Sequence, residues 1–272
     1  MNAAMKHPVW ILAAVLVVLG IAAPSLGMPL SKLTEIVIYV LYGLGVNMLV
    51  GYTGLVPFGA SVFFGCSTYF VAIFMLRTGG NEVVALGVAV LGSLLLALLL
   101  GLLILRRRGL YFSLLTLAAS QIAFEVAFKW TALTGGENGL QGVSLSLLTT
   151  PLRLYLFTAG VAVAVAWGLW RLAHAPFGRA LQALRDNEQR MSCLGYNTAH
   201  LKLSAFCLCG AVVGLAGGLL ALLLQGAYAD NLGWEHAGDA LLMTVLGGVH
   251  QFLGPLWGCL LYTSDAADEE DS

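Results

Sequence analysis

The stretch VVALGVAVLGSLLLALLLGLLIL, residues 83–105, decides the fold class, because it has no charged residue and is long enough to cross a bilayer as one helix. Apolar runs of comparable length follow it at residues 110–130, 152–173 and 203–224, and shorter ones occupy 9–26, 36–50 and 61–76. An eighth run, 240–261, is interrupted by glycine and proline, which predicts a half-helix, a turn and the start of another span. We therefore predict an all-α polytopic membrane protein with about eight transmembrane helices, forming one transmembrane domain over residues 1–261.

The composition supports this class. Of the 272 residues 59% are hydrophobic and only 10% are charged, whereas a soluble domain carries about 25% charged residues. The formal net charge of -1 provides no basic field for nucleic acid. The five cysteines show no paired CxxC spacing and mostly lie in apolar runs, so the sequence predicts neither a disulfide framework nor a metal site.

Lysine and arginine indicate the orientation, because they accumulate on the cytoplasmic side of membrane proteins. With a cytoplasmic amino terminus and every span crossing, nine of the thirteen lie inside: Lys6, Arg106, Arg107, Arg108, Arg171, Arg179, Arg185, Arg190 and Lys202. The other four, Lys32, Arg77, Lys129 and Arg153, lie outside. We therefore expect the amino terminus to be cytoplasmic.

The connecting segment, residues 174–202, is then a long cytoplasmic loop. Pro176 suits a helix start and Gly195 a helix stop. Between them Leu181, Leu184, Glu188 and Met191 recur at helical spacing, which predicts one amphipathic helix outside the bilayer. Such a helix is either a solvated connector or a docking element for a cytoplasmic partner.

Within this segment, FGRALQALRDNE at 177–188 and LGYN at 194–197 resemble the cytoplasmic coupling loop of permeases of branched-chain amino-acid ABC transporters, in particular the M-type subunit. Four further stretches resemble the same family: GLGVNMLVGYTGLVPFGASVFFG at 43–65, GLYFSLLTLAA at 109–119, LTGGENGL at 133–140 and LLMTVLGGVHQFLGPLWG at 242–258. The resemblance favours the docking interpretation and covers most of the chain from about residue 36 to residue 260.

The resemblance implies an importer in a bacterial inner membrane, surrounded by lipid. A periplasmic solute-binding protein would deliver solute, a second permease subunit would share the pathway, and cytoplasmic ATPase subunits would use ATP and Mg. This chain never contains Gly-Lys, so it lacks a Walker A loop, and we expect it to bind no cofactor and to be no enzyme. By position the resemblance assigns ATPase coupling to Phe177, Gly178, Arg179, Ala183, Arg185, Asp186, Asn187, Glu188 and Gly195.

Two glycine and proline breaks interrupt the apolar runs, at residues 51–59 and 247–255. Broken helices at membrane depth can line a transport pathway, but the same residues also make tight turns between helices, and both interpretations stay open here. The pathway candidates are the glycines of the two breaks and two amides within spans: Asn47, Gly51, Gly54, Gln121, Gly247 and Gly248.

Glu125 is the acid that lies well inside a strong span. Lys129 follows four residues later, so we expect an interfacial ion pair rather than a proton relay. Gly210, Gly214, Gly217 and Gly218 share one helix face, and the small-residue pattern predicts close packing within the subunit.

A pathway in which no charged side chain is assigned to solute binding suits a small neutral solute. Branched-chain amino acids, urea and short amides all fit. An ion-coupled secondary transporter is the alternative mechanism, and it would need intramembrane acids. Residues 262–272 hold five of the fourteen acids and are expected to be a disordered tail foreign to the family, so that the chain is truncated at its carboxyl end.

Overall fold

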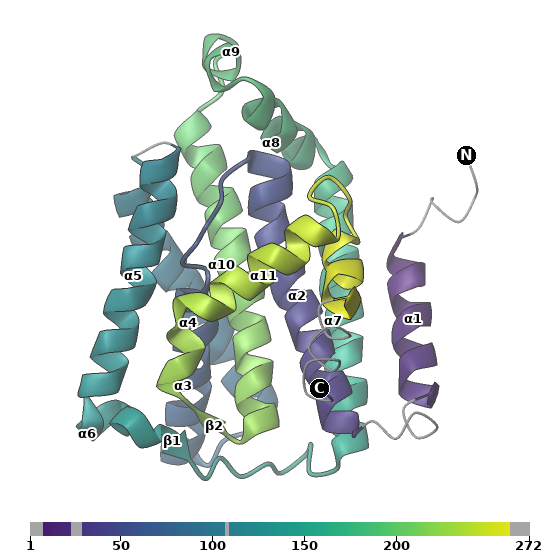
Figure 1. Ribbon diagram of the computed structural model, residues 1–272, viewed down its shortest axis with the longest axis vertical. Coiled ribbons are helices and arrows are strands. Elements are labelled where there is room, and N and C mark those ends of the chain that lie inside the picture. Colours follow the sequence, from purple (N-terminus) through teal and green to yellow (C-terminus); the bar gives the residue numbers. More distant parts are fainter. Residues whose placement is uncertain (1–7, 23–28, 107–108, 262–272) are drawn as a thin grey trace, which may run out of the picture.

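The computed structural model describes residues 8–22, 29–106 and 109–261 as a bundle of long helices (Figure 1). Within these residues six helices are long and apolar enough to cross a membrane: α2 Leu30–Thr53, α3 Ser61–Thr78, α4 Glu82–Ile104, α5 Leu110–Lys129, α7 Pro151–His174 and α10 Thr198–Leu224. Helix α1, Pro8–Ala22, is apolar but shorter, and residues 23–26 of the predicted first span lie outside the described part. The predicted all-α polytopic class is confirmed.

Shorter elements mark the two ends of the bundle. At one end, the connector end, α8 (Pro176–Asp186) and α9 (Glu188–Cys193) link α7 to α10. At the other, the ribbon end, α6 (Thr131–Thr134) and η2 (Gly136–Asn138) precede the strand β1 (Leu140–Gln141), which pairs antiparallel with β2 (Gly226–Ala227). Helix η3 (Ala229–Leu232) and α11 (Trp234–Leu246) follow β2, and the chain turns at 247–253 into a final helical stretch, 254–261.

Helices α2 and α10 form the centre of the bundle and are the most buried of the six. Small residues on α10 allow this position. A side chain at Gly217 would collide with the backbone oxygen of Phe64 on α3, and one at Gly214 with Ser93 on α4. Glycine thus lets α10 pack directly against two neighbours, which confirms the predicted packing within the subunit.

Glu82, at the start of α4, is fully buried and fixes the loop at 142–150. Its carboxylate accepts hydrogen bonds from the backbone nitrogens of Ser146 and Leu147, the latter at 2.8 Å, and from the Ser146 hydroxyl at 3.3 Å. These donors compensate the charge in a place where no water reaches it. Sequence reasoning missed this residue because Glu82 directly precedes an apolar run, where an acid is expected to point into solvent.

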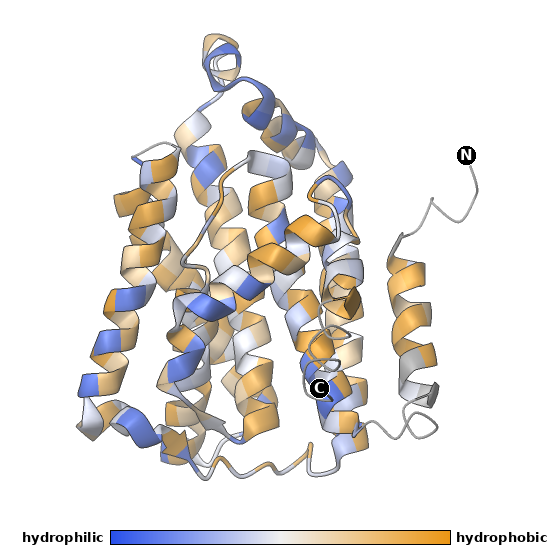
Figure 2. Ribbon diagram, in the orientation of Figure 1, coloured by the Kyte–Doolittle hydropathy of each residue, from blue (hydrophilic) through white to orange (hydrophobic). Residues whose placement is uncertain are grey.

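The basic residues separate by end of the bundle. The order of the helices brings the described members of the larger predicted group to the connector end: Arg106, Arg171, Arg179, Arg185, Arg190 and Lys202. The smaller group of four lies toward the ribbon end. Lys6, Arg107 and Arg108 lie outside the described residues. Figure 2 shows hydrophilic residues on α8 and α9 at the connector end of an otherwise largely hydrophobic bundle.

Candidate functional site

The connecting segment forms two helices, so the prediction of one continuous helix from Pro176 to Gly195 was wrong. The chain bends at Asn187, whose backbone is extended (φ -159°, ψ 99°). The side chain of Asn187 accepts a hydrogen bond from the backbone nitrogen of Arg190 at 2.9 Å and so caps α9. Asparagine at this position can either cap the start of a helix or continue one, and the spacing of the apolar residues does not indicate which of the two occurs.

The apolar side of the segment packs onto the bundle. Leu181, Leu184 and Met191 are buried, as their spacing predicts. Glu188 occupies the same stripe but forms an ion pair with Lys202 of α10, at 2.7 Å, and both side chains are largely covered. This pair fixes α9 to the amino-terminal end of α10, so the connecting segment is attached to the bundle at both of its ends.

The first break is a longer connection rather than one tight turn: residues 54–57 lack regular structure and a turn follows at 58–60. Helix α2 ends at Gly54, a residue with φ +72° that favours glycine, and residues 54–60 then run down beside the bundle to the start of α3 (Figure 1). The Ser113 hydroxyl of α5 donates to the Val56 oxygen at 2.7 Å. A side chain at Gly59 would collide with the Thr116 backbone, also on α5. Protein contacts thus support this non-helical backbone, as membrane depth requires.

The second break is a tight hairpin of two short helices. Turns at 247–253 join α11 to the helical stretch 254–261, which folds back against α11. The return is close enough that a side chain at Gly247 would collide with the Gly254 oxygen, and one at Gly258 with the Met243 oxygen. The two breaks therefore differ in form: the first is a longer connection and the second is a tight turn.

The structure brings the two breaks together. The buried side chain of Asn47 donates from Nδ2 to the Gln251 oxygen at 3.0 Å. A side chain at Gly51 would collide with the Val249 oxygen, so the last turn of α2 approaches the second break backbone to backbone. The Asn47 Oδ1 atom is buried without a hydrogen-bond partner. Two segments about two hundred residues apart in sequence thus form one junction.

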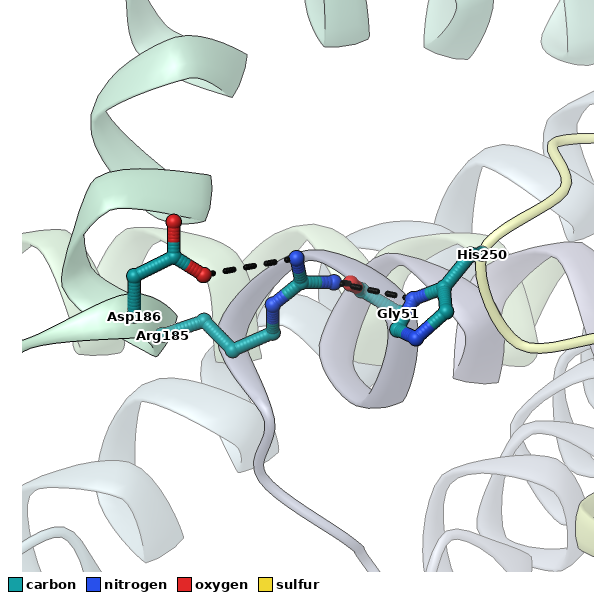
Figure 3. A network of polar contacts seen from close by, with 4 residues as sticks. All are labelled: Gly51, Arg185, Asp186 and His250. Atoms are coloured by element: carbon teal, nitrogen blue, oxygen red, sulfur yellow. Dashed lines mark hydrogen bonds and ion pairs between the residues drawn. The ribbon is translucent and has the colours of Figure 1, made fainter.

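Arg185 of α8 joins the connecting segment to this junction (Figure 3). Its Nη1 atom donates to the Gly51 oxygen at 2.5 Å and lies 3.1 Å from Nδ1 of His250. Arginine has only donors, so the Nδ1 atom of His250 is the acceptor in this contact. The Arg185 stem also packs beside Gly54. One side chain of the connecting segment therefore contacts both breaks.

The other coupling candidates surround this contact in different ways. Gly178 fits closely over the backbone of Ala173, and Phe177 packs against the core. Arg179 and Ala183 are exposed on α8, and Asp186 is an exposed neighbour of Arg185 at 3.5 Å. Gly195 has φ +85° just after α9 and there forms the sharp exit from that helix. The exposed residues leave a surface on α8 and α9 that is open to a partner.

The pathway candidates do not all meet. Asn47, Gly51 and Gly54 lie at the junction, next to the turn that contains Gly247 and Gly248. Gln121 lies elsewhere, on the exposed side of α5. His250 and the Gln251 carbonyl, which sequence reasoning did not single out, complete the junction in its place. Both residues lie inside the second break, which the sequence predicted; the sequence did not predict that they contact α2 and α8.

Helix α5 carries a polar stripe on its exposed side. Gln121, Glu125 and Lys129 follow at four-residue intervals, and the predicted ion pair between Glu125 and Lys129 is present at 2.8 Å. The Gln121 amide finds no hydrogen-bond partner among the described residues. The stripe lines a shallow hollow of about 570 Å³ together with Ile122, Val126 and Trp130.

Helix α4 provides a direct comparison with α5. In each of the two helices, 28% of an apolar stretch of 18 residues is buried within the chain. The large exposed side chains of α4 are all apolar, including Leu91, Leu95, Leu99 and Leu103. An apolar face suits lipid, whereas ionisable side chains in spans usually face protein or water. The stripe on α5 thus distinguishes that face from the face of α4.

No group of three histidine, cysteine, aspartate or glutamate side chains in the described ranges could hold a metal ion. The five cysteines, all of which the structure describes, are free thiols. The site is a junction in which an amphipathic surface segment is attached by hydrogen bonds to interrupted helices. With six membrane-length helices around it, this junction belongs to a polytopic membrane protein.

The comparison with known families specifies the class. The family "Branched-chain amino acid transport system / permease component" matches residues 28–264. The chain belongs to this family.

Several curated proteins are similar to the chain. The high-affinity branched-chain amino acid transport system permease protein LivM of Salmonella typhimurium is 29% identical over 260 residues, covering 85% of this chain and 61% of that protein. A probable LivM of Methanocaldococcus jannaschii is 23% identical over 267 residues, with 83% and 76% covered. The autoinducer 2 import system permease protein LsrC of Shigella flexneri is 31% identical over 128 residues, or 46% of this chain and 36% of that one. The chain thus spans about three fifths of the length of the Salmonella LivM, and no solved structure matches it significantly.

Proposed function

We propose that this chain is a membrane-spanning permease subunit of an ATP-driven ABC importer for branched-chain amino acids. It resides in a bacterial inner membrane with its amino terminus in the cytoplasm. A periplasmic binding protein delivers the solute and a second permease subunit completes the pathway. Separate ATPase subunits bind ATP and Mg and dock on the connecting segment.

The observation that carries the proposal is the double contact of Arg185 with Gly51 and His250. A partner that displaces α8 pulls on both breaks at once, because the same guanidinium nitrogen bonds to each of them. The Glu188–Lys202 pair attaches the far side of the segment to α10, the helix at the centre of the bundle. Movement of the surface segment thereby reaches the interrupted helices without any nucleotide site in this chain.

Two features support an ATP-driven transporter over an ion-coupled one. Secondary transporters need intramembrane acids or exposed carbonyl groups to bind the coupling ion. Glu125 is engaged with Lys129, and Glu82 is satisfied by the loop at 142–150. These two acids are therefore committed to local partners. The similarity to LivM favours branched-chain amino acids over urea or short amides as solute, and the similarity to LsrC covers less than half of the chain.

We assign the polar stripe of α5 to the side of the second permease subunit. A Gln121 amide facing lipid would leave its hydrogen-bonding groups unsatisfied, and a neighbouring membrane protein or an enclosed aqueous path would satisfy them. The exposed apolar face of α4 has no such requirement and belongs to lipid.

Labelling with a lipid-soluble maleimide tests this assignment. Gln121→Cys should react in the isolated, membrane-embedded chain and be protected when the second permease is coexpressed. Leu95→Cys on α4, the matched control, should react equally in both states. Equal reaction of Gln121→Cys in both states would show that α5 also faces lipid.

Uptake by proteoliposomes tests the function. The chain is reconstituted with the second permease, the ATPase subunits and the binding protein, and uptake of labelled leucine is measured with ATP or with a non-hydrolysable analogue. We expect accumulation only with ATP, unaffected by ionophores, and no accumulation of labelled urea. Accumulation that follows an ion gradient without ATP would replace the proposal by the secondary-transporter alternative, and ATP-driven uptake of urea alone would overturn the solute assignment.

A further inference from the structure

The groove between α1 and α7 points to a second kind of binding site, for a lipid rather than a solute. The groove has a volume of about 360 Å³ and lies between two helices that contact each other. Its lining is apolar and rich in tryptophan: Val9, Trp10 and Ala13 from α1, with Gly160, Val163, Ala164, Trp167 and Trp170 from α7. This lining suits a hydrocarbon chain.

The two helices are fixed to each other near the ribbon end. Near the ribbon end the Tyr155 hydroxyl of α7 donates to the Leu16 oxygen of α1 at 2.6 Å. Gly20 of α1 approaches the same tyrosine ring so closely that an added side chain would contact it at 2.7 Å. The helices run in opposite directions, so the amino-terminal residues of α1 and the carboxyl-terminal turns of α7 border the groove toward the connector end (Figure 1).

The absence of a side chain at Gly160 keeps the groove open. No atom lies within 4 Å of the position that a Cβ atom would occupy there. Trp10 and Trp167 are 73% and 54% exposed, so large aromatic surfaces on both walls are uncovered by the chain itself. In a membrane only lipid or another membrane protein can cover them.

A positive charge lies over one of the tryptophans that line the groove. The Arg171 guanidinium lies over the Trp167 ring, 5.6 Å from its centre. No carboxylate among the described residues forms an ion pair with Arg171. His174 lies one turn further along α7, and its Nδ1 bonds to the Trp170 oxygen at 2.8 Å. A cation beside an apolar groove between membrane helices is suited to an anionic lipid headgroup.

We propose that an anionic phospholipid occupies this groove, with an acyl chain beside Gly160 and between the tryptophans and its phosphate at Arg171. The charge selects the lipid class. The acyl chain by itself provides little selectivity, because every lipid in the bilayer offers one. This site is independent of the transport cycle proposed above, since its groove and its phosphate contact at Arg171 lie outside both the junction of the breaks and the connecting segment.

Competitive lipid retention tests the proposal. The purified full chain is incubated in detergent with equal amounts of phosphatidylglycerol and phosphatidylcholine of identical acyl chains, and the lipid retained after washing is quantified by mass spectrometry. We expect about a fivefold preference for phosphatidylglycerol, the factor associated with one cation beside an anionic lipid. Arg171→Gln should reduce the preference to about one. Arg153→Gln, at the opposite end of α7, should leave it unchanged.

Filling the groove provides a second and independent test. Gly160→Leu should lower retention of both lipids at least threefold. Gly168→Leu is the matched control, because it makes the same change on the same helix, also with no atom within 4 Å, but away from the groove lining. If Gly160→Leu fails to fold, Ala164→Leu replaces it. A wild-type protein without lipid preference, an unchanged preference in Arg171→Gln, or equal retention by the Gly160 and Gly168 variants would overturn the proposal.

Discussion

Replacing Arg185 by alanine should uncouple ATP hydrolysis from transport. The change removes a charged hydrogen bond of 2.5 Å to the Gly51 carbonyl and a second contact of 3.1 Å to His250. A hydrogen bond to a charged group contributes about 1.5–3 kcal/mol. The Asp186 contact contributes little, since that side chain is 71% exposed and its nearest oxygen is 3.5 Å away. The attachment of α8 to the breaks therefore weakens by about 2 kcal/mol, which corresponds to roughly thirtyfold.

The assay is leucine uptake and ATP hydrolysis by the same proteoliposomes. We expect uptake by Arg185→Ala to fall roughly thirtyfold, with ATP hydrolysis retained, because the exposed docking surface of α8 is unchanged. His250→Ala should give a smaller loss, since it removes only the longer contact, and Arg153→Ala, at the opposite end of α7, is the control that should retain uptake. The double variant Arg185→Ala/His250→Ala should be no worse than Arg185→Ala. Full uptake by Arg185→Ala would refute the coupling role, and loss of hydrolysis together with uptake would show that Arg185 serves ATPase docking instead.

Four other expectations follow from the packing and the ion pairs. Glu82→Gln should lower the melting temperature by about 5 °C, because a neutral amide oxygen accepts the two backbone hydrogen bonds more weakly and the amide nitrogen cannot accept from the Ser146 hydroxyl; an unchanged melting temperature would contradict that role. Gly217→Ala should destabilise the bundle by about 1–3 kcal/mol, measured by unfolding in mixed micelles, since the added methyl group meets a backbone oxygen. Glu125→Gln should change leucine uptake less than about twofold, as expected for an exposed ion pair, and complete loss of uptake would instead favour a proton relay. Lys202→Glu should disorder the connecting segment, seen as faster proteolysis, and adding Glu188→Lys should restore protection. If the double variant is cleaved as fast as Lys202→Glu, the ion pair does not attach the segment to α10.

The sequence was sufficient for the membrane fold, because span length and lack of charge are local properties. It also indicated the small-residue face of α10 and the pair of Glu125 and Lys129, since helical spacing fixes which side chains are neighbours. It was insufficient at Asn187, where capping and continuation of a helix compete, and the choice depends on tertiary contacts. It likewise could not reveal that Arg185 meets His250, because that contact depends on how α8 and the second break pack around the end of α2.

The different forms of the two breaks illustrate the same limit. Glycine and proline mark both segments, yet the first is a longer connection held against α5 through Ser113 and the second is a tight hairpin at Gly247. Composition signals an interruption but not its geometry, which depends on the neighbouring backbone. Gln121 was a reasonable pathway candidate as an amide within a span, and only the structure shows that it lies on the outer side of α5, away from the junction.

The most direct test of the central claim is a distance measurement across the junction during the transport cycle. Spin labels are placed at Gln182→Cys on α8 and Gln251→Cys in the second break, after the exposed Cys193 has been replaced by serine, and distances are measured in the assembled transporter with and without ATP. We predict that this distance stays constant while the distance from Gln251→Cys to Ser204→Cys on α10 changes, because α8 and the breaks move together. A distance between α8 and the second break that changes with ATP while the second break stays fixed relative to α10 would contradict the account.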